Sequence, residues 1–423
     1  MASENAKVRG KLVFFMVKCH MCEGANLEMF LDLGHHPHSD GFLTAEEVQQ
    51  PEVFYPLSVY LCHDCGLVQI GHIVDGKTLY QKNYIYEASI TKTGRDHYFG
   101  FAEDVCKRFN LPKGSLVVDI GSNVGVLLMG FKEQGMKVLG VDPAPNIAKI
   151  AFEQHGIETL PDFFTVDLAK QIVKEKGRAA VIAATNIFAH LSDLHNAVKA
   201  VDALLGKGGV FVIESPYLVD LLSNLEYDTI YHQHLRYLSI RPMQAFFSNY
   251  GMEVFDVMKT PIHGGSIRVF VSRKGERPVQ PSVRKFLDLE EAEQAYSIVR
   301  LRKFAADVRE HRRLMRRMLD GLKQQGKRIV GVSAPAKGNT LLNYCGIDGS
   351  DLDYLTEKSK LKQGLFTPGT HIPIYGDDKL ASDNPDYALI LAWNFADEIM
   401  RNLEPFRRKG GKFIIPIPMP RIV

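Results

Sequence analysis

The stretch between residues 116 and 142 constrains the fold of this chain more than any other. Leu116–Ile120 (LVVDI) is an apolar run typical of a buried parallel strand. The glycine-containing loop Gly121–Gly125 (GSNVG) follows, and the apolar spacing of Val126–Gln134 predicts a helix. A second strand is expected at Lys137–Val141. This order predicts an open α/β sheet of the nucleotide-binding kind.

The composition is that of a soluble globular protein, with 45% apolar and 24% charged residues. A chain of 423 residues is too long for a single core, so several domains are expected. The formal charge of +2 gives no case for nucleic acid or an anionic membrane as partner. No apolar run approaches the roughly 20 residues needed to cross a bilayer. The first residues, MASENAKVRGK, lack the apolar core of a signal peptide, so a cytoplasmic protein is expected.

The loop after the first strand indicates which ligand the sheet binds. Gly121 permits a sharp turn, and Gly125 lets a ligand approach the helix start near Asn123. A dinucleotide fingerprint has a third glycine and places a pyrophosphate at the helix N-terminus. Here Asp119 precedes the loop, where it would repel a pyrophosphate but pair with the amino group of a methionine moiety. With Asp142 placed to accept two ribose hydroxyls, the pattern favours S-adenosylmethionine over NAD.

Further candidate ligand residues follow the other strands of the predicted sheet. Ligands of open α/β sheets bind beyond the carboxyl ends of the strands. Asn186 and His190 come just after the fourth strand and should face the same crevice. Phe163 is expected to stack on adenine, although core packing of Phe163 and Phe164 is the alternative. His263 lies in a tight turn between the last two strands and is a candidate substrate contact. The four remaining strands are expected at Ala180–Ala184, Val210–Glu214, Met252–Val257 and Ile267–Ser272.

The segment Glu214–Ser239 is unusually rich in tyrosine and histidine. Both side chains can move protons and hydrogen-bond an oxyanion, whereas a core segment would carry Leu and Val. The alternative is a loop whose aromatic side chains cover the end of the sheet. Its position after the nucleotide-type array favours an active site. The residues concerned are Tyr217, Tyr227, Tyr231, His232, His234 and Tyr237.

Two C-x-x-C pairs near the N-terminus predict a structural metal site. Each pair can place two thiolates on one tetrahedral ion through a tight turn, and two pairs together indicate Zn²⁺. A redox pair is the alternative. Four thiolates leave no open position, so no catalytic role is assigned to the metal. The four ligands are Cys19, Cys22, Cys62 and Cys65.

Two features lie near these pairs. The histidines of His35-His36-Pro37-His38 could bind metal, but a solvated loop is preferred because proline and glycine break any regular spacing. Tyr84 and Tyr86 alternate in a polar segment, which suggests phenols presented on one side of an extended strand.

The C-terminal third predicts a second α/β unit behind an interrupted, charged helix over Ser282–Gln325. A strand at Arg328–Val332 then turns into another helix. Small residues, Lys337 and the helix start at Gly338 and Asn339 suit a phosphate, although the loop is not a Walker motif.

With these residues collected, the chain resembles the sugar C-methyltransferases that methylate C-3 of nucleotide-linked 4-keto sugars. The resemblance covers nearly the whole chain. It rests on the two cysteine pairs, V-V-D-I-G-S-N-x-G, V-L-G-V-D-P-A, N-x-F-A-H, D-T-I-Y-H-x-H, H-G-G-S-I-R, A-P-A-K-G-N-T-L-L-N-Y, P-G-T-H-I-P-I and W-N-F-A-D-E-I.

The resemblance implies three parts, with the sugar nucleotide between the last two. These are a zinc-binding domain at 1–78, an S-adenosylmethionine-dependent methyltransferase domain of the Rossmann-like class I type at 79–280, and a Rossmann-like sugar-nucleotide domain at 281–423. The corresponding expectations are a role in deoxysugar biosynthesis, a substrate linked to dTDP, with other nucleotides as the alternative, and a monomer or homodimer.

The resemblance also implies a mechanism. A ketone at C-4 acidifies the C-3 proton, a base removes it, and the enolate carbon takes the methyl group. The base maps onto His234, with Tyr231 and His190 near the sugar. A tyrosine ahead of the core domain also approaches the sugar, and both Tyr84 and Tyr86 fit that role.

This chain departs from the family pattern at several positions. Gln233 replaces the usual Glu beside the base, and Val124 replaces an Asp in the glycine loop. Gln cannot accept a proton as Glu can, so these departures bear on the substrate and the rate but not on the fold. Two alternatives are a methyltransferase acting on another carbonyl acceptor and a catalytically impaired homologue that binds a sugar nucleotide or a partner protein.

Overall fold

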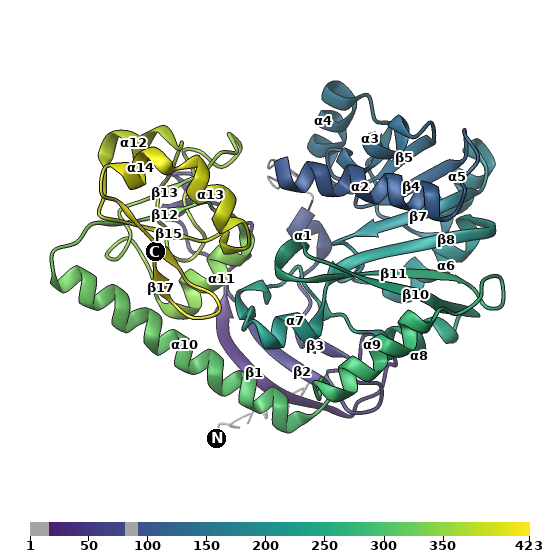
Figure 1. Cartoon of the computed structure of the whole chain (residues 1–423), viewed down its shortest axis with the longest axis horizontal. Coiled ribbons are helices and arrows are strands. Elements are labelled where there is room, and N and C mark those ends of the chain that lie inside the picture. Colours follow the sequence, from purple (N-terminus) through teal and green to yellow (C-terminus); the bar gives the residue numbers. More distant parts are fainter. Residues whose placement is uncertain (1–16, 81–91) are drawn as a thin grey trace, which may run out of the picture.

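The computed structural model describes residues 17–80 and 92–423. The described chain forms three sheets, of four, seven and six strands (Figure 1). Tyr84 and Tyr86 lie outside the described residues. Among the residues described, no helix is both long and apolar enough to cross a membrane.

The four-stranded sheet joins the N-terminal segment to the middle of the chain. Strands β1 (Leu27–His36), β2 (Tyr55–Cys62) and β3 (Val68–Ile70) pair antiparallel in chain order. The fourth strand, β9 (Arg236–Tyr237), comes from the histidine- and tyrosine-rich segment and pairs antiparallel with β3. The segment that carries the cysteine pairs is therefore tied directly to the predicted catalytic segment.

The seven-stranded sheet has the order β10-β11-β8-β7-β4-β5-β6. The strands from β8 to β6 are parallel, and β11 runs antiparallel to both of its neighbours. The predicted strands of the nucleotide-binding unit are confirmed. Their bounds are β4 Leu116–Ile120, β5 Lys137–Val141, β6 Thr159–Leu160, β7 Ala179–Thr185, β8 Leu205–Pro216, β10 Met252–Thr260 and β11 Ser266–Arg273.

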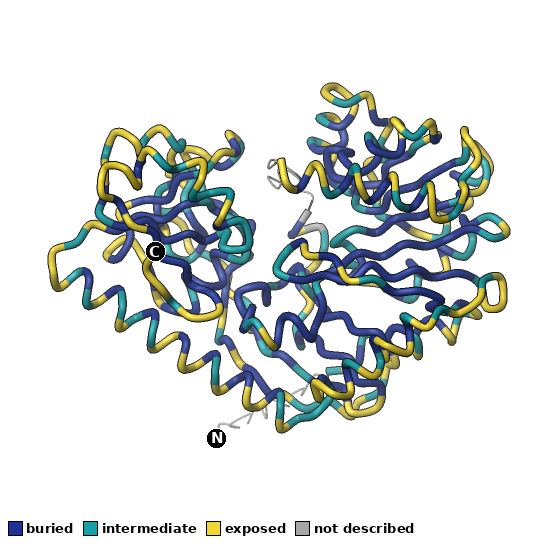
Figure 2. The backbone as a smooth tube through the Cα atoms, in the orientation of Figure 1, coloured by how far each residue is buried: buried dark blue, intermediate teal, exposed yellow. Residues whose placement is uncertain are grey.

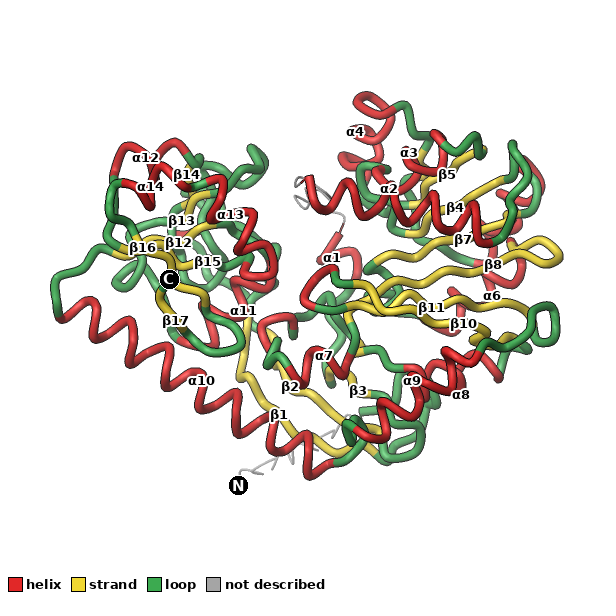
Figure 3. The backbone as a smooth tube through the Cα atoms, viewed as in Figure 1, coloured by secondary structure: helices red, strands yellow, loops and turns green. Residues whose placement is uncertain are grey.

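Helices cover both faces of this sheet, as its near-continuous apolar strands require, because successive side chains along a strand point to opposite faces (Figure 3). Val117 of β4 packs with buried residues of α2, α3 and α4, whereas Val118 belongs to the cluster that holds buried residues of α5, α6 and α8. The bounds are α1 Gly76–Tyr80, α2 Lys92–Arg108, α3 Val126–Glu133, α4 Pro145–His155, α5 Val166–Lys176, α6 Leu194–Leu204, α7 Leu218–Ser223 and α8 Ile240–Ser248.

A long helix leads from this domain to the third sheet. The predicted interruption is present: α9 (Pro281–Ala292) and α10 (Ile298–Gln324) are separate helices. In Figure 1, α10 runs beneath the sheets toward the C-terminal unit. That unit has strand order β14-β13-β12-β15-β16-β17. Its elements are β12 Ile329–Val332, α11 Ala336–Cys345, β13 Leu355–Thr356, β14 Ile374–Tyr375, α12 Asp378–Asp383, β15 Tyr387–Ile390, α13 Ala396–Asn402, α14 Glu404–Arg408, β16 Lys412–Ile415 and β17 Arg421–Ile422.

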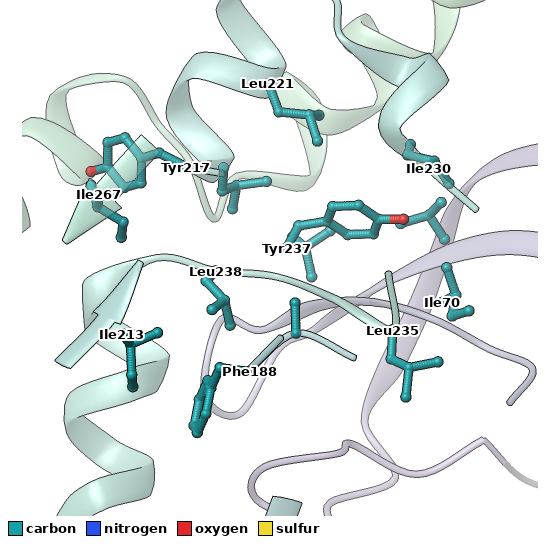
Figure 4. Packing of buried hydrophobic residues seen from close by; sticks show 14 of the residues in the cluster. Ile70, Phe188, Ile213, Tyr217, Leu221, Ile230, Leu235, Tyr237, Leu238 and Ile267 are labelled. Atoms are coloured by element: carbon teal, nitrogen blue, oxygen red, sulfur yellow. The ribbon is translucent and has the colours of Figure 1, made fainter. Parts of the chain in front are cut away.

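The tyrosine- and histidine-rich segment divides between core and cavity. Tyr217, Tyr227 and Tyr237 are buried, and Figure 4 shows Tyr217 and Tyr237 among packed apolar residues such as Phe188 and Leu238. These tyrosines therefore belong to the core. His232 is also buried, with its Nε2 3.3 Å from the carbonyl oxygen of Pro56, and it is not part of the described cavity lining. Tyr231 and His234 are described with the site below.

The expectation of a solvated loop in the N-terminal segment is wrong in part, as the mixture of buried and exposed backbone in Figure 2 illustrates for the whole chain. His35 is exposed, but His36 at the end of β1 is only 3% exposed, and burial lowers the pKa of both His36 and His38. The residues after β1 are covered because they contact the C-terminal unit. Leu43, shortly after the histidines, exchanges backbone hydrogen bonds with Phe366.

Candidate active site

A cavity of about 470 Å³ lies where the three parts of the chain meet. Its lining includes Asp40 from the N-terminal segment, residues at the carboxyl ends of β4, β5 and β7, and Lys337 from the C-terminal unit. Of the candidate residues, those that line the cavity are Asp119, Gly121, Asn123, Asp142, Phe163, Asn186, His190, Tyr231, Gln233, His234, His263 and Lys337. The cavity is thus both the expected cofactor crevice and the expected catalytic site.

The glycines of the loop after β4 serve two different purposes. Gly121 has φ +65°, and a Cβ there would lie 2.5 Å from the Ile187 side chain, so only glycine fits this turn. Gly125 also has a positive φ, +82°, but a Cβ there would press on Ile157. Gly125 is not part of the described cavity lining. Its missing side chain instead allows the start of α3 to pack closely against Ile157.

Two buried carboxylates at the strand ends give the cavity an acidic end. The oxygens of Asp142 accept backbone hydrogen bonds from Asn123 at 2.9 Å and from Ala144 at 3.0 Å. Asp119 is 2% exposed, and its Oδ1 has no hydrogen-bond partner among the described residues. Burial, together with the nearby charge of Asp142, raises the pKa of Asp119 well above its usual range. A cation placed here would supply the missing partner.

This acidic end fits S-adenosylmethionine. The cofactor carries an ammonium and a sulfonium, and the orphaned oxygen of Asp119 is the kind of group that an ammonium satisfies. A pyrophosphate would instead meet two buried carboxylates. Phe163 is partly buried and lines the cavity beside this end, whereas Phe164 is 8% exposed and belongs to the core. Asn186 adds a second buried oxygen, Oδ1, without a partner among the described residues.

His234 is held in one tautomer by its neighbours. Its Nδ1 lies 2.7 Å from the carbonyl oxygen of Thr229, which can only accept, so Nδ1 carries the proton. Its Nε2 lies 2.8 Å from the Tyr231 hydroxyl and therefore accepts a hydrogen bond from the phenol. The His190 ring stands nearby, with its centroid 4.8 Å from that of His234.

Burial keeps the histidines of the cavity neutral. It lowers the pKa of His234 to about 4, and the positive charge of Lys337 adds to the effect. Burial likewise lowers the pKa of His263 to about 4 and that of His190 well below its usual value. The pKa of His234 in the free protein therefore lies well below the ordinary value of a histidine. A neutral imidazole whose Nε2 carries a lone pair is a form that can accept a proton.

Lys337 reaches the same cavity from the first turn of α11. Its ammonium donates to Oδ1 of Asn394 and lies 3.9 Å from the centroid of the Trp393 ring. Trp393 in turn donates to the buried carboxylate of Asp228 at 2.6 Å. Burial lowers the pKa of Lys337 to about 8, although Asp228 and Glu226 oppose the shift.

Gly338 and Asn339, the two residues that follow Lys337, are not part of the described cavity lining. Gly338 packs against Leu391, where a Cβ would lie 3.0 Å from the Leu391 Cβ. Asn339 is buried, and its Nδ2 donates to the carbonyl of Ser39 at 2.6 Å. Among the residues described, the structure therefore brings Lys337 alone of this predicted phosphate group to the site.

The four cysteines of the N-terminal pairs form one cluster. Their sulfur atoms all lie within 4.8 Å of one another, and Cys19–Cys65 and Cys22–Cys62 are each separated by 3.5 Å. Tetrahedral Zn–S bonds place sulfurs about 3.8 Å apart, so the set fits Zn²⁺ with little movement. Cys19, Cys62 and Cys65 are buried, and four thiolates complete a tetrahedral ligand set, as expected for a structural site.

The metal site lies close to the catalytic segment. The Gln69 side chain of β3 accepts from the backbone of His20 at 2.8 Å and donates to the carbonyl of Lys18. In the antiparallel pairing of β3 with β9, Gln69 lies opposite Arg236, and Arg236 comes two residues after His234 in the sequence. The metal site therefore anchors the strand that follows the predicted base.

Comparison with known proteins identifies the family of this chain. The C-methyltransferase NovU of Streptomyces niveus is 35% identical over 407 residues, which span 96% of each chain. Residues 19–80 match a putative zinc-binding domain, residues 95–257 a methyltransferase domain, and residues 261–418 a C-methyltransferase C-terminal domain. The chain belongs to the sugar C-methyltransferase family. It is an S-adenosylmethionine-dependent C-methyltransferase with a zinc-binding domain.

Other similarities cover parts of the chain only. The ubiquinone biosynthesis O-methyltransferase of Methylobacterium sp. (strain 4-46) is 30% identical over 101 residues, 23% of this chain and 39% of that protein. The structure of the PH0226 protein of Pyrococcus horikoshii OT3 matches 45% of this chain and 95% of its own, at 16% identity and a TM-score of 0.36.

Sequence reasoning missed three groups in the site. Asp40 follows a histidine run that was assigned to solvent, and its side chain lines the cavity. The Thr229 carbonyl that fixes the His234 tautomer belongs to the backbone and has no sequence signal. Trp393 and Asn394 contact Lys337 and belong to the W-N-F-A-D-E-I motif. That motif is the sequence signal from which their place in the site could be predicted.

Proposed function

We propose that this enzyme methylates C-3 of a nucleotide-linked 4-keto sugar through an enolate. The observation that carries the proposal is the pairing of Tyr231 and His234 in the same cavity as the acidic end of the cofactor crevice. A dTDP-linked sugar of deoxysugar biosynthesis is the substrate class proposed.

The proposed base is Nε2 of His234. When the C-3–H bond breaks, its proton passes to Nε2 and its electron pair is delocalised onto the C-4 oxygen. The imidazolium keeps its Nδ1–H bond to the carbonyl of Thr229, which stabilises the charge. S-adenosylmethionine, when bound, would supply a methyl group on its sulfonium: as the C-3 carbon takes this methyl, the carbon–sulfur bond would break and its electron pair would stay on sulfur.

Tyr231 has a second role in this scheme. In the free protein its hydroxyl donates to Nε2 of His234, which holds the ring in place. Because Nε2 has only one lone pair, the phenol must turn away from it before the C-3 proton can be transferred. The C-4 ketone oxygen of a bound substrate would give the hydroxyl another acceptor, so Tyr231 would donate to the developing enolate oxygen while Nε2 takes the proton. His190, whose ring lies beside His234, is proposed to contact the sugar.

Lys337 is proposed to pair with the pyrophosphate of the substrate. Lys337 lines the cavity, and the positive charge of its ammonium lowers the pKa of His234. Neutralising that charge with a phosphate raises the pKa of His234, so substrate binding would strengthen the base.

The test is a panel of 4-keto sugar nucleotides incubated with a labelled methyl donor and read by mass spectrometry. A mass gain of one methyl group located at C-3 is expected for at least one member. Methyl transfer to oxygen or nitrogen, or to no panel member, would contradict the proposal.

A further inference from the structure

Asp40 brings a carboxylate of the zinc-binding domain into the active-site cavity. It is 9% exposed and lines the same cavity as His234 and Lys337. Its position is fixed from two sides. The carbonyl of the preceding Ser39 accepts from Asn339 of α11 at 2.6 Å, and the nearby Leu43 bonds the backbone of Phe366 at 3.0 and 2.8 Å.

Asp40 is hydrogen-bonded to the residue beside the proposed base. Nε2 of Gln233 donates to Oδ2 of Asp40 at 2.7 Å, and Gln233 is 1% exposed. An ionised carboxylate can only accept, so it fixes which way the Gln233 amide points. The amide must present its nitrogen to Asp40, which leaves the oxygen Oε1 on the other side.

Each partner of this pair keeps one unsatisfied acceptor. Oδ1 of Asp40 and Oε1 of Gln233 are buried and have no hydrogen-bond partner among the described residues. Buried acceptors without a donor are unfavourable and rare in native proteins. Both residues line the cavity, so a molecule bound there can supply the donors. The requirement is for donor groups, because neither oxygen can donate.

We propose that Asp40 and Gln233 form a specificity-determining acceptor pair that recognises a hydroxyl or amine on the sugar ring beside the ketone. This inference rests on the proposed sugar substrate. His234 follows Gln233 in the sequence and lines the same cavity as Gln233 and Asp40, so the acceptor pair and the proposed base can contact one bound molecule. A donor satisfied here holds the ring with its acidic C–H toward His234.

The pair discriminates against sugars that lack a donor, because such a sugar leaves the two acceptor oxygens without hydrogen bonds. A substrate without a donor at this position removes water from both oxygens but forms no hydrogen bond to either. Polar sites reject deoxy analogues for this reason. We expect the wild-type enzyme to prefer donor-bearing sugars over the 3-deoxy analogue by at least tenfold in kcat/KM.

The experiment compares three substrates, bearing hydroxyl, amine or hydrogen at C-3, in wild-type enzyme and Asp40→Asn. The substitution preserves shape but removes the charge and can turn an amide nitrogen toward the cavity. Asp32→Asn makes the same change on an exposed carboxylate of the same domain and serves as the matched control. Zinc content and S-adenosylmethionine affinity are measured for each protein to establish folding.

Asp40→Asn should lower kcat/KM for the preferred donor-bearing sugar by about tenfold or more and leave the deoxy sugar nearly unchanged. Of the hydroxyl- and amine-bearing sugars, the one whose kcat/KM falls more in Asp40→Asn carries the donor that the pair recognises. In the double variant Asp40→Asn/Gln233→Glu, the amide and carboxylate exchange places across the same hydrogen bond. This variant should recover the preference, which a purely structural role of Asp40 would not produce.

An equal loss on all three sugars would show that Asp40 only supports the fold and would overturn the inference while the proposed function stands. A folded, inactive Asp40→Asn whose swap variant is also inactive would overturn it in the same way. Wild-type enzyme that turns over no panel member would overturn the proposed function, and the inference with it.

Discussion

The Tyr231 hydroxyl lies 2.8 Å from Nε2 of His234, while Nδ1 of the same ring lies 2.7 Å from the carbonyl oxygen of Thr229. These two contacts fix the tautomer without any carboxylate. A carboxylate bonded to the ring would favour the charged form, whereas a backbone carbonyl orients the ring and leaves it neutral. The imidazole therefore stays unprotonated in a cavity that would otherwise have to solvate a charge.

We predict that His234→Ala loses roughly 10²- to 10⁴-fold in methylation rate, the usual scale for a general base. Loss of the ring also removes the acceptor of the Tyr231 hydroxyl. Solvent deuterium exchange at C-3, measured without the methyl donor, reports the proton step alone and should fall in parallel. His155→Ala on α4, outside the described cavity lining, is the control. Exchange at the wild-type rate in His234→Ala would show that His190 or Tyr231 is the base.

We predict that Asp119→Asn weakens S-adenosylmethionine binding by at least about tenfold. The buried carboxylate has an orphaned oxygen for the cofactor's ammonium, and hydrogen bonds to charged groups contribute roughly 1.5–3 kcal/mol. Calorimetric titration measures the affinity. Asp167→Asn, on the exposed first turn of α5, makes the same chemical change outside the described cavity lining and should bind as wild type. Tight NAD binding in place of S-adenosylmethionine would contradict the assignment of the acidic end.

A matching loss is expected for Asp142→Ala. That substitution removes the acceptor of two backbone N–H groups, at Asn123 and Ala144, as well as the proposed contacts to the ribose. The glycine loop should become less stable along with the weaker binding. Hydrogen exchange at the two amides separates the structural part of the effect from the part due to the lost cofactor contacts.

We predict that Lys337→Ala raises the KM for the sugar nucleotide and leaves cofactor affinity unchanged. The variant should also titrate differently. The charge of Lys337 lowers the pKa of His234, so its removal raises that pKa and moves the acidic limb of kcat/KM to higher pH. In the wild type the pKa of Lys337 is about 8, so kcat/KM should fall as pH rises through 8. Lys337→Arg stays charged and should abolish that fall. An unchanged KM in Lys337→Ala would refute the phosphate contact.

The sequence predicted the nucleotide-binding sheet well because its signals are local. The apolar run of β4, the glycines of the loop and Asp142 at the end of β5 each depend on a few neighbouring residues. The interrupted helix before the C-terminal unit was also readable from its apolar spacing. Such features follow from the backbone geometry that each residue permits, so no distant contact is needed to infer them.

The unpredicted parts depend on contacts between distant segments. Nothing near His36 or Asp40 indicates that α11, 300 residues later, will cover this loop through the bond from Asn339 to Ser39. The same limit explains the tyrosine-rich segment. Tyrosines and histidines occur along the whole segment, yet Tyr217 and Tyr237 lie in the core, whereas Tyr231 lines the cavity. Tyr237 is placed by the pairing of β9 with β3, and Tyr217 by its hydrogen bond to Glu290 of α9, and both partners are distant in sequence.

We predict that Cys62→Ser loses zinc and soluble yield together, because metal-binding energy at closed thiolate sites is folding energy. The metal anchors β3, and β3 pairs with β9 beside His234, so any soluble fraction should also lose activity. Elemental analysis of the purified protein measures the metal. Cys106→Ser, on α2 and outside the cluster, should retain zinc. Wild-type protein without zinc would contradict the assignment.

The final prediction concerns Gln233→Glu, which places a second carboxylate against Asp40. Two carboxylates at hydrogen-bond distance hold a proton between them at neutral pH, so the pair gains less than one full negative charge. Even a partial charge beside His234 favours its imidazolium and raises its pKa above the value near 4 set by burial. The basic form of His234 is then lost at a higher pH. The variant should therefore stay active, with the acidic limb of its kcat/KM profile shifted upward. Adding Asp40→Asn removes the competing carboxylate and leaves a full charge at position 233, so the limb should shift further. An acidic limb at the wild-type position in both variants would show that residue 233 does not act on the base.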